Sequence, residues 1–190
     1  MKTDHADILF LLENARRGAA LGLDMAHLAS AIGARNYVRI ANDIARQTPA
    51  ARLLDWGCGL GQMTYLLRRR GLTVTPYDLG APDAPPPDLP LARGLGVIRS
   101  QERARLPFAD GAFDAALSCG VLEHVVESGG DERASLGELR RVLRPGGRLF
   151  IYQLPQEHAW QEALIRRLRL GYAHPQRYTL PGVTALLRES

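Results

Sequence analysis

The first part of the chain shows a helical pattern of hydrophobic positions. Between about residues 4 and 47, apolar residues recur at spacings of three and four, which places them on one face of a helix. Three glycines are expected to divide this stretch into separate helices: Gly18, Gly22 and Gly33. Pro49 cannot continue a helix, so it separates a helical lead, residues 1–48, from the rest of the chain.

After the lead, short apolar strands alternate with helices. The pattern predicts strands over the ranges 51–56, 72–77, 96–99, 113–119 and 148–153. Helices are expected over 62–70, which Gly71 ends, over about 132–143 and over 181–189. Strands that alternate with helices predict an α/β fold, in which a parallel sheet carries helices on both faces.

The crossover between the second and third strands is too rich in proline for a regular helix. Residues 81–90 read APDAPPPDLP, which favours extended backbone, so we expect a loop with at most one helical turn. No internal repeat and no domain boundary is apparent. We therefore interpret the lead, the core (51–153) and a C-terminal helical segment (154–190) as one domain over residues 1–190.

Composition narrows the class of protein. With 190 residues, 46% of them hydrophobic and 23% charged, the chain has the make-up of one globular domain. Its two cysteines, Cys58 and Cys119, lie far apart and form neither a disulfide framework nor a metal-ligand cluster. No apolar run is long enough for a signal peptide or a membrane span. We expect a cytoplasmic protein without a metal ion and without stable membrane insertion.

The net charge of +4 does not by itself indicate a nucleic-acid partner. Almost every basic residue is arginine, and Lys2 is the only lysine, a skew typical of codon bias. The basic runs 68–70 and 166–169 lie near the ends of helical patterns, where cations complement the helix dipole. We interpret both runs as solvated helix faces and expect no nucleic-acid partner.

The most informative segment is a glycine-rich turn between the first strand and the next helix. Residues 53–61 read LLDWGCGLG, and in an open α/β sheet this position, at the carboxyl end of a strand, binds ligands. The G-x-G-x-G spacing differs from the G-x-G-x-x-G of dinucleotide-binding loops. Asp55 precedes the first glycine by two residues, and Asp78 closes the second strand, where a carboxylate can accept both hydroxyls of a ribose. Together these features indicate a nucleoside ligand.

Three further segments come after the glycine loop in a recognisable order: 105–114 (RLPFADGAFD), 118–125 (SCGVLEHV) and 141–149 (RVLRPGGRL). With the loop, they resemble the class I S-adenosylmethionine-dependent methyltransferases, in the branch that acts on small molecules, lipids and quinones (methyltransferase type 11 domain). The resemblance covers about residues 53–152. It implies a Rossmann-like, doubly wound parallel sheet with strand order 3-2-1-4-5 and S-adenosyl-L-methionine as cofactor.

The resemblance also assigns residues to the cofactor pocket. The glycine loop would shape the methionine end through Asp55, Gly57, Cys58, Gly59 and Gly61. Asp78 would take the ribose hydroxyls. Glu102, where the family usually has an aspartate, would bind the adenine amino group beside the backbone of Arg103. Ser118 and Cys119 would line the methionine side at the end of the fourth strand.

No residue is assigned as catalytic. Methyl transfer from a sulfonium needs mainly alignment, and a base is required only if the acceptor must lose a proton early. His124 and His158 are the candidates for such a base, although the neighbours of His124 favour a structural hydrogen-bonding role. The candidates for contact with the methyl acceptor are His124 and, shortly after the fifth strand, His158 and Trp160.

The end of the chain departs from the family pattern. The family usually adds a helix and an antiparallel hairpin after the fifth strand, and this sequence stops at Ser190 inside the expected helix, so we expect the hairpin to be missing. This leaves two hypotheses. The chain is an enzyme that methylates a small-molecule, lipid or glycan acceptor, or a truncated or degenerate domain that serves as a cofactor-binding or interaction module. In the second case the exposed fifth strand favours a homodimer.

Two other classes of enzyme are disfavoured by the sequence. A nicotinamide-dependent oxidoreductase would require the other glycine spacing. A nucleic-acid methyltransferase of the base-flipping type would carry an Asn-Pro-Pro-aromatic motif after the fourth strand, where this chain has residues 118–121, SCGV.

Overall fold

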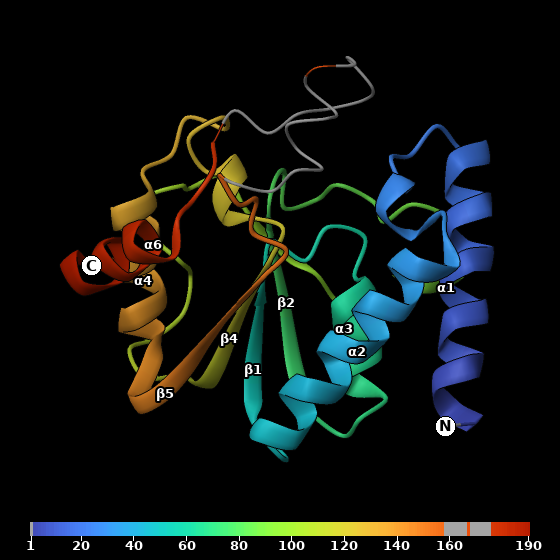
Figure 1. The fold of residues 1–190 in the computed structure, drawn as a ribbon, viewed down its shortest axis with the longest axis horizontal. Helices are drawn as coiled ribbons and strands as arrows, with labels where there is room; N and C mark the ends of the chain where they lie inside the picture. The colour runs from blue at the N-terminus through green and yellow to red at the C-terminus, as the bar shows by residue number, and fades with distance from the viewer. Residues whose placement is uncertain (1, 158–166, 168–175) are drawn as a thin grey trace. The chain divides into compact units, whose positions relative to one another are not determined.

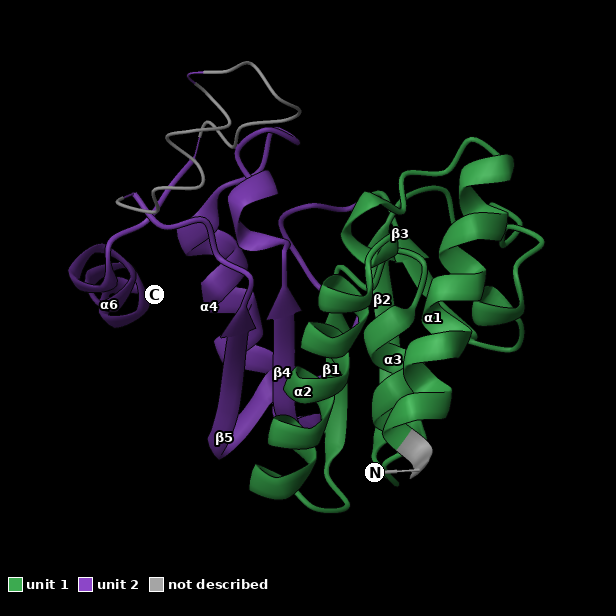
Figure 2. Cartoon of the chain, turned by 45° about the vertical axis from the view of Figure 1, so that its right-hand side comes forward, with its two compact units in different colours: residues 1–101 green, residues 102–190 purple. Residues whose placement is uncertain are grey.

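The computed structural model describes residues 2–157, 167 and 176–190. The chain divides into two compact units, residues 1–101 and 102–190 (Figure 2). No helix in the described ranges is both long enough and apolar enough to span a bilayer. The expectation of one domain over residues 1–190 stays a prediction.

Unit 1 opens with three helical segments (Figure 1): α1 (Lys2–Ala20), the 3-10 turn η1 (Ala26–Leu28) and α2 (Ala31–Gln47). Gly22 lies between helices, as predicted. The breaks expected at Gly18 and Gly33 are wrong, because both glycines lie inside helices. A Cβ on Gly18 would lie 2.7 Å from Cγ of Met25, and one on Gly33 would lie 2.2 Å from the carbonyl oxygen of His27. Both glycines therefore permit close packing and do not end a helix.

The remaining elements of unit 1 build a three-stranded parallel sheet from β1 (Arg52–Trp56), β2 (Thr73–Leu79) and β3 (Ile98–Ser100). Helix α3 (Gln62–Arg68) joins the first two strands, and the proline-rich crossover carries a single 3-10 turn, η2 (Pro90–Ala92), as expected. Leu53 and Leu54 of β1 are completely buried, which fits an apolar strand covered on both faces.

In the basic run 68–70, Arg68 and Arg69 are exposed, as expected, but the Arg70 side chain is only 10% exposed, so the interpretation as a solvated face is wrong for Arg70. The run 166–169 lies, apart from position 167, outside the described residues. Arg69 Nε lies 2.6 Å from Oδ1 of Asp7, and Arg70 Nη1 lies 3.1 Å from Oδ2 of the same carboxylate. Asp7, on α1, is completely buried, and Arg70 also donates to the amide oxygen of Asn42 on α2 at 2.6 Å. Two guanidinium groups thus compensate one buried charge and join α3 to both lead helices.

Unit 2 contains two parallel strands, β4 (Phe113–Cys119) and β5 (Leu143–Tyr152). Between them lie the 3-10 turn η3 (Leu122–His124) and α4 (Glu132–Val142), and α6 (Leu180–Glu189) lies beside α4 (Figure 1). The fifth strand begins five residues earlier than expected. Leu143 already pairs with Phe113, and the segment up to Arg148 forms an irregularity that shifts the register.

Across the chain the strands lie in the order β3-β2-β1-β4-β5, which confirms the predicted Rossmann-like α/β fold. The pairings within each unit are parallel, and no antiparallel pair occurs among the residues that the structure describes. The predicted boundaries of the first and fourth strands agree with the structure to within a residue, because buried apolar runs bounded by polar or glycine residues mark them clearly.

Candidate functional site

The glycine loop of unit 1 is bound to the strand beside it. The backbone N–H groups of Gly57 and Cys58 both donate to the carbonyl oxygen of Tyr77 on β2, at 2.9 and 3.0 Å. The three glycines have positive φ, of 71° at Gly57, 54° at Gly59 and 89° at Gly61. L-residues with side chains rarely adopt this conformation, so the sequence pattern is required by the turn itself.

Asp78 closes the loop from the other side. Its Oδ2 accepts the N–H of Gly59 at 2.8 Å, and its Oδ1 accepts the N–H of Leu79 at 2.8 Å. Partial burial raises the pKa of this carboxyl, although the two backbone donors oppose that effect. A carboxylate has about four acceptor positions, so two remain for ligand hydroxyls. The structure thus places Asp78 beside the glycine loop at the carboxyl end of β2.

Asp55 occupies a different environment. It is only 2% exposed, and its Oδ2 accepts the hydroxyl of Thr64 on α3 at 2.5 Å. Burial raises the pKa of Asp55 to about 6, against the effect of Thr64. Its role within unit 1 is therefore to hold the first turn of α3 against the end of β1. Cys58 is also buried, and burial raises the pKa of its thiol, which keeps the thiol protonated.

Gly59 and Gly61 differ in what surrounds them. A Cβ on Gly59 would meet nothing within 4 Å, whereas one on Gly61 would lie 2.0 Å from Cδ1 of Leu95. Gly61 is therefore required by packing within the protein, and Gly59 leaves open space beside the backbone. Open space beside a backbone held by Asp78 is the arrangement that admits a ligand.

Two residues that the sequence did not suggest lie near the loop. Gln62 comes directly after Gly61, and its Nε2 lies 3.5 Å from Nε2 of His27 on η1. The Oε1 of Gln62 is buried and has no hydrogen-bond partner in the described part of the chain. Burial lowers the pKa of His27, whose ring lies 5.6 Å from that of Tyr37. The position of Gln62 after the glycine loop was an available signal, whereas His27 had none.

In unit 2, Glu102 and Arg103 lie in an exposed turn. Oε1 of Glu102 accepts the N–H of Ala104 at 2.9 Å. The guanidinium group of Arg103 lies over Gly129, where a Cβ would come within 2.9 Å of Nη1. The adenine contact expected of this pair stays a prediction.

Ser118 and Cys119 end β4, as expected. Ser118 is 1% exposed, and its hydroxyl oxygen has no hydrogen-bond partner within the described ranges. Cys119 is half-buried and stands opposite Tyr152 of β5, whose carbonyl oxygen accepts the N–H of Gly120 at 3.0 Å. The carboxyl ends of both strands thus meet at Gly120.

His124, in the turn η3, has its Nδ1 2.8 Å from Oε2 of Glu127. Its neighbour Glu123, which the sequence did not suggest, is 2% exposed. The other two candidates for acceptor contact, His158 and Trp160, lie outside the described residues.

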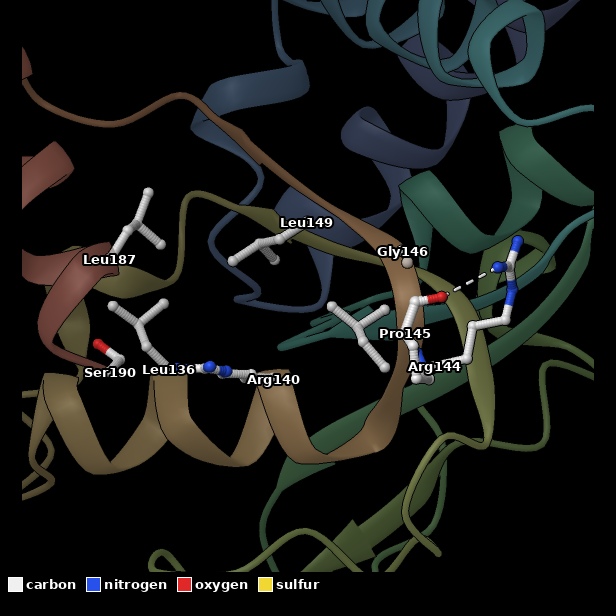
Figure 3. A pocket seen from close by; sticks show the side chains of 10 residues that line it. Leu136, Arg140, Arg144, Pro145, Gly146, Leu149, Leu187 and Ser190 are labelled. Carbon is white, nitrogen blue, oxygen red and sulfur yellow. Dashed lines mark hydrogen bonds between the residues drawn. The ribbon is translucent and has the colours of Figure 1, made fainter.

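Two cavities flank β5 within unit 2. One, of about 430 Å³, lies between α4, β5 and α6, and the side chains of Leu136, Leu149 and Leu187 point into it (Figure 3). It adjoins residues 143–149, the beginning of β5, whereas ligands of parallel sheets bind at the carboxyl ends of strands. The other, of about 760 Å³, adjoins the carboxyl end of β5 and is lined by Ile151, Leu154 and Tyr178 among others.

The strand order and the anchored glycine loop define a Rossmann-like domain with a nucleoside-binding type of turn. The model of the family described as "Methyltransferase domain" matches residues 54–151, more than half of the chain. The chain belongs to this family, which confirms the resemblance found in the sequence.

Individual relatives agree on the family and differ in the acceptor that their names state. The chain is 35% identical over 126 residues to the "Demethylmenaquinone methyltransferase" of Thermus thermophilus, covering 62% of this chain and 53% of that one. It is 32% identical over 123 residues to "Probable tRNA methyltransferase 9B" of Bos taurus, and the match covers 65% of this chain and 26% of that one. The chain thus spans about half the length of the first relative and about a quarter of the length of the second.

Among solved structures, a SAM-dependent methyltransferase from Thermotoga maritima is similar in fold, with a TM-score of 0.59 and 20% identity. The match covers 80% of this chain and 69% of that one.

Proposed function

We propose that the chain binds S-adenosylmethionine at the glycine loop of unit 1 and transfers its methyl group to a small-molecule or lipid-like acceptor. The observation that carries this proposal is the loop itself, with three positive-φ glycines and the N–H of Gly59 held by Asp78 at 2.8 Å. Family membership supports the same function.

The residues present fit this cofactor, which supplies a methyl group activated on a cationic sulfur. The open space at Gly59 lets a ligand approach the backbone, and Asp78 keeps two acceptor positions for the ribose hydroxyls. Asp55, Gly57, Cys58 and Gly61 would form the walls of the methionine end.

From unit 2, we propose Glu102 and Arg103 for adenine, and Ser118 and Cys119 for the methionine side. The buried Ser118 hydroxyl without a partner in the described ranges supports the second assignment.

The cavity at the carboxyl end of β5 supports a small acceptor. Its volume of about 760 Å³ falls within the range of small-molecule sites, and Ile151, Leu154 and Val183 give it apolar walls. An apolar acceptor such as a demethylated quinol suits these walls better than a tRNA does.

A second candidate function, an interaction module, is supported by the leucine-lined cavity beside the start of β5 (Figure 3). Pairing of β5 with a second copy would give a homodimer. Gel filtration that shows a monomer at micromolar concentration would exclude this arrangement.

Calorimetric titration tests the proposed function. We expect micromolar affinity for S-adenosylmethionine and for S-adenosylhomocysteine, and no competition by NADH. The acceptor is then tested by transfer of a labelled methyl group to a demethylated benzoquinol and, separately, to total tRNA. Absence of heat with both cofactor forms would overturn cofactor binding, and labelling of tRNA alone would overturn the small-molecule acceptor.

A further inference from the structure

Glu123 is a buried carboxyl group with an unused oxygen. The residue is 2% exposed, and its Oε2 is buried without a hydrogen-bond partner in the part of the chain that the structure describes. It lies in η3, four residues after the end of β4, and its charged neighbours among the described residues are His124 and Glu127 of the same turn. A buried carboxyl oxygen without a hydrogen-bond partner is costly, so its position requires an explanation.

The surroundings of Glu123 point to the end of the sheet where ligands bind. A Cβ on Gly120 would lie 3.8 Å from Oε1 of Glu123 and 3.5 Å from Oε1 of Gln153. Gln153, directly after β5, has a φ of 59°, which is uncommon for a residue with a side chain. Gly120 therefore leaves room between two side-chain oxygens, one from each strand end.

Tyr178 is close enough to Glu123 to feel its charge, and it also lines the cavity at the end of β5. Its hydroxyl donates to Glu132, and it lines the cavity of about 760 Å³. Burial raises the pKa of Tyr178, and the charges of Glu132 and Glu123 add to the effect. The groups that face Glu123 are thus His124 and Glu127 from its own turn, and Tyr178 from the segment before α6. Tyr178 already donates its proton to Glu132 and does not satisfy Glu123.

We propose that Glu123 accepts the proton of a hydroxyl group on the methyl acceptor, so that the acceptor is an alcohol or a phenol. This inference rests on the proposed methyl transfer. The hydroxyl proton passes to the free carboxylate oxygen of Glu123 as the acceptor oxygen forms its bond to the methyl carbon. The electron pair of the broken carbon–sulfur bond stays on sulfur, and the proton leaves Glu123 to water after product release. Burial raises the pKa of Glu123, which makes its carboxylate a stronger base than an exposed glutamate.

The test compares Glu123→Gln with Glu127→Gln, a control that removes a carboxylate from the same turn. The two acceptor probes are 4-methylphenol, which is protonated at pH 8, and 4-nitrophenol, which is largely ionised there. Removal of a general base typically costs about 10²–10⁴-fold. We therefore expect Glu123→Gln to lower kcat/KM at least about 100-fold for 4-methylphenol. For 4-nitrophenol, which needs no base, the loss should be under about tenfold.

Thermal unfolding at pH 7 gives a second readout that does not depend on turnover. Replacing a buried, unpaired carboxyl with the neutral amide should leave the Tm unchanged or raise it, because functional groups of this kind are retained at the expense of stability. A structural glutamate would behave in the opposite way. Glu123→Asp, which keeps the acid and shortens its reach, should retain more activity with 4-methylphenol than Glu123→Gln does.

The outcomes separate this inference from the proposed function. A lower Tm for Glu123→Gln, or equal losses with both phenols, would assign Glu123 a structural role and overturn the inference alone. The inference also fails by itself if the wild-type chain binds the cofactor and methylates neither phenol. A wild-type chain that binds no S-adenosylmethionine in calorimetry would overturn the proposed function, and this inference with it.

Discussion

Asp55 makes the stability of this protein depend on pH in a way that one substitution can isolate. The carboxyl is almost completely buried behind the glycine loop, and burial raises its pKa from 3.8 to about 6. The folded state therefore binds the proton more tightly than the unfolded state does. The stabilising contribution of the protonated group is complete below pH 3.8 and is lost as pH rises through about 6.

The size of the effect comes from the pKa difference. At 1.36 kcal/mol for each pH unit, a pKa of about 6 against 3.8 corresponds to about 3 kcal/mol. Asp55→Asn places a neutral group of the same shape beside Thr64 and removes this dependence. Any weakening of the bond to the Thr64 hydroxyl shifts the variant's stability by the same amount at every pH. Because part of the change falls below pH 4, the stability of Asp55→Asn relative to the wild type should rise by about 2.4 kcal/mol between pH 4 and pH 7.

Urea unfolding at pH 4, 5, 6 and 7 measures this difference. Asp83→Asn, at an exposed position in the proline-rich crossover, serves as the matched control and should show the wild-type profile. Parallel profiles for the wild type and Asp55→Asn would refute the reasoning, because they would show that Asp55 titrates alike in the folded and unfolded states.

Other substitutions test the rest of unit 1. Arg70→Ala should lower the free energy of unfolding by about 3 kcal/mol in urea titrations, because buried Asp7 loses one of two cations; a change below about 1 kcal/mol would mean that Arg69 suffices. Gly59→Ala and Gly71→Ala should each cost about 1–2 kcal/mol, since both glycines have positive φ and open space. Only Gly59→Ala should weaken S-adenosylhomocysteine binding in calorimetry, and equal weakening would contradict a site at the loop. Asp78→Asn should weaken that binding at least about tenfold, or about 1.4 kcal/mol, and unchanged affinity would show that the loop holds its shape without this carboxylate.

Most of the architecture could be predicted because it depends on local patterns. Apolar runs bounded by polar residues or glycine marked β1 and β4, and the proline-rich crossover showed that only a short turn joins β2 to β3. The start of β5 could not be predicted in this way. Pro145 and Gly146 are typical turn residues, and the pairing of Leu143 with Phe113 depends on a strand thirty residues away in the sequence.

The candidate site also contains residues that local patterns predict and residues that depend on tertiary packing. The glycines of the loop and Asp78 could be predicted from spacing, because a turn with positive φ requires glycine wherever it occurs. The burial of Glu123 and the proximity of His27 to Gln62 depend on packing between segments distant in sequence, and no local pattern marks them.

The sequence by itself thus determined the order of strands and helices, the place of the glycine loop and the family, since each depends on residues close together in the chain. Only the tertiary structure decided which charges are buried and which oxygens lack partners. Arg69 and Arg70 face Asp7 across more than sixty residues, and Asp55 is held by Thr64 instead of facing open solvent. Burial and pairing are properties of the packed chain, because they depend on which distant side chains exclude water from each group.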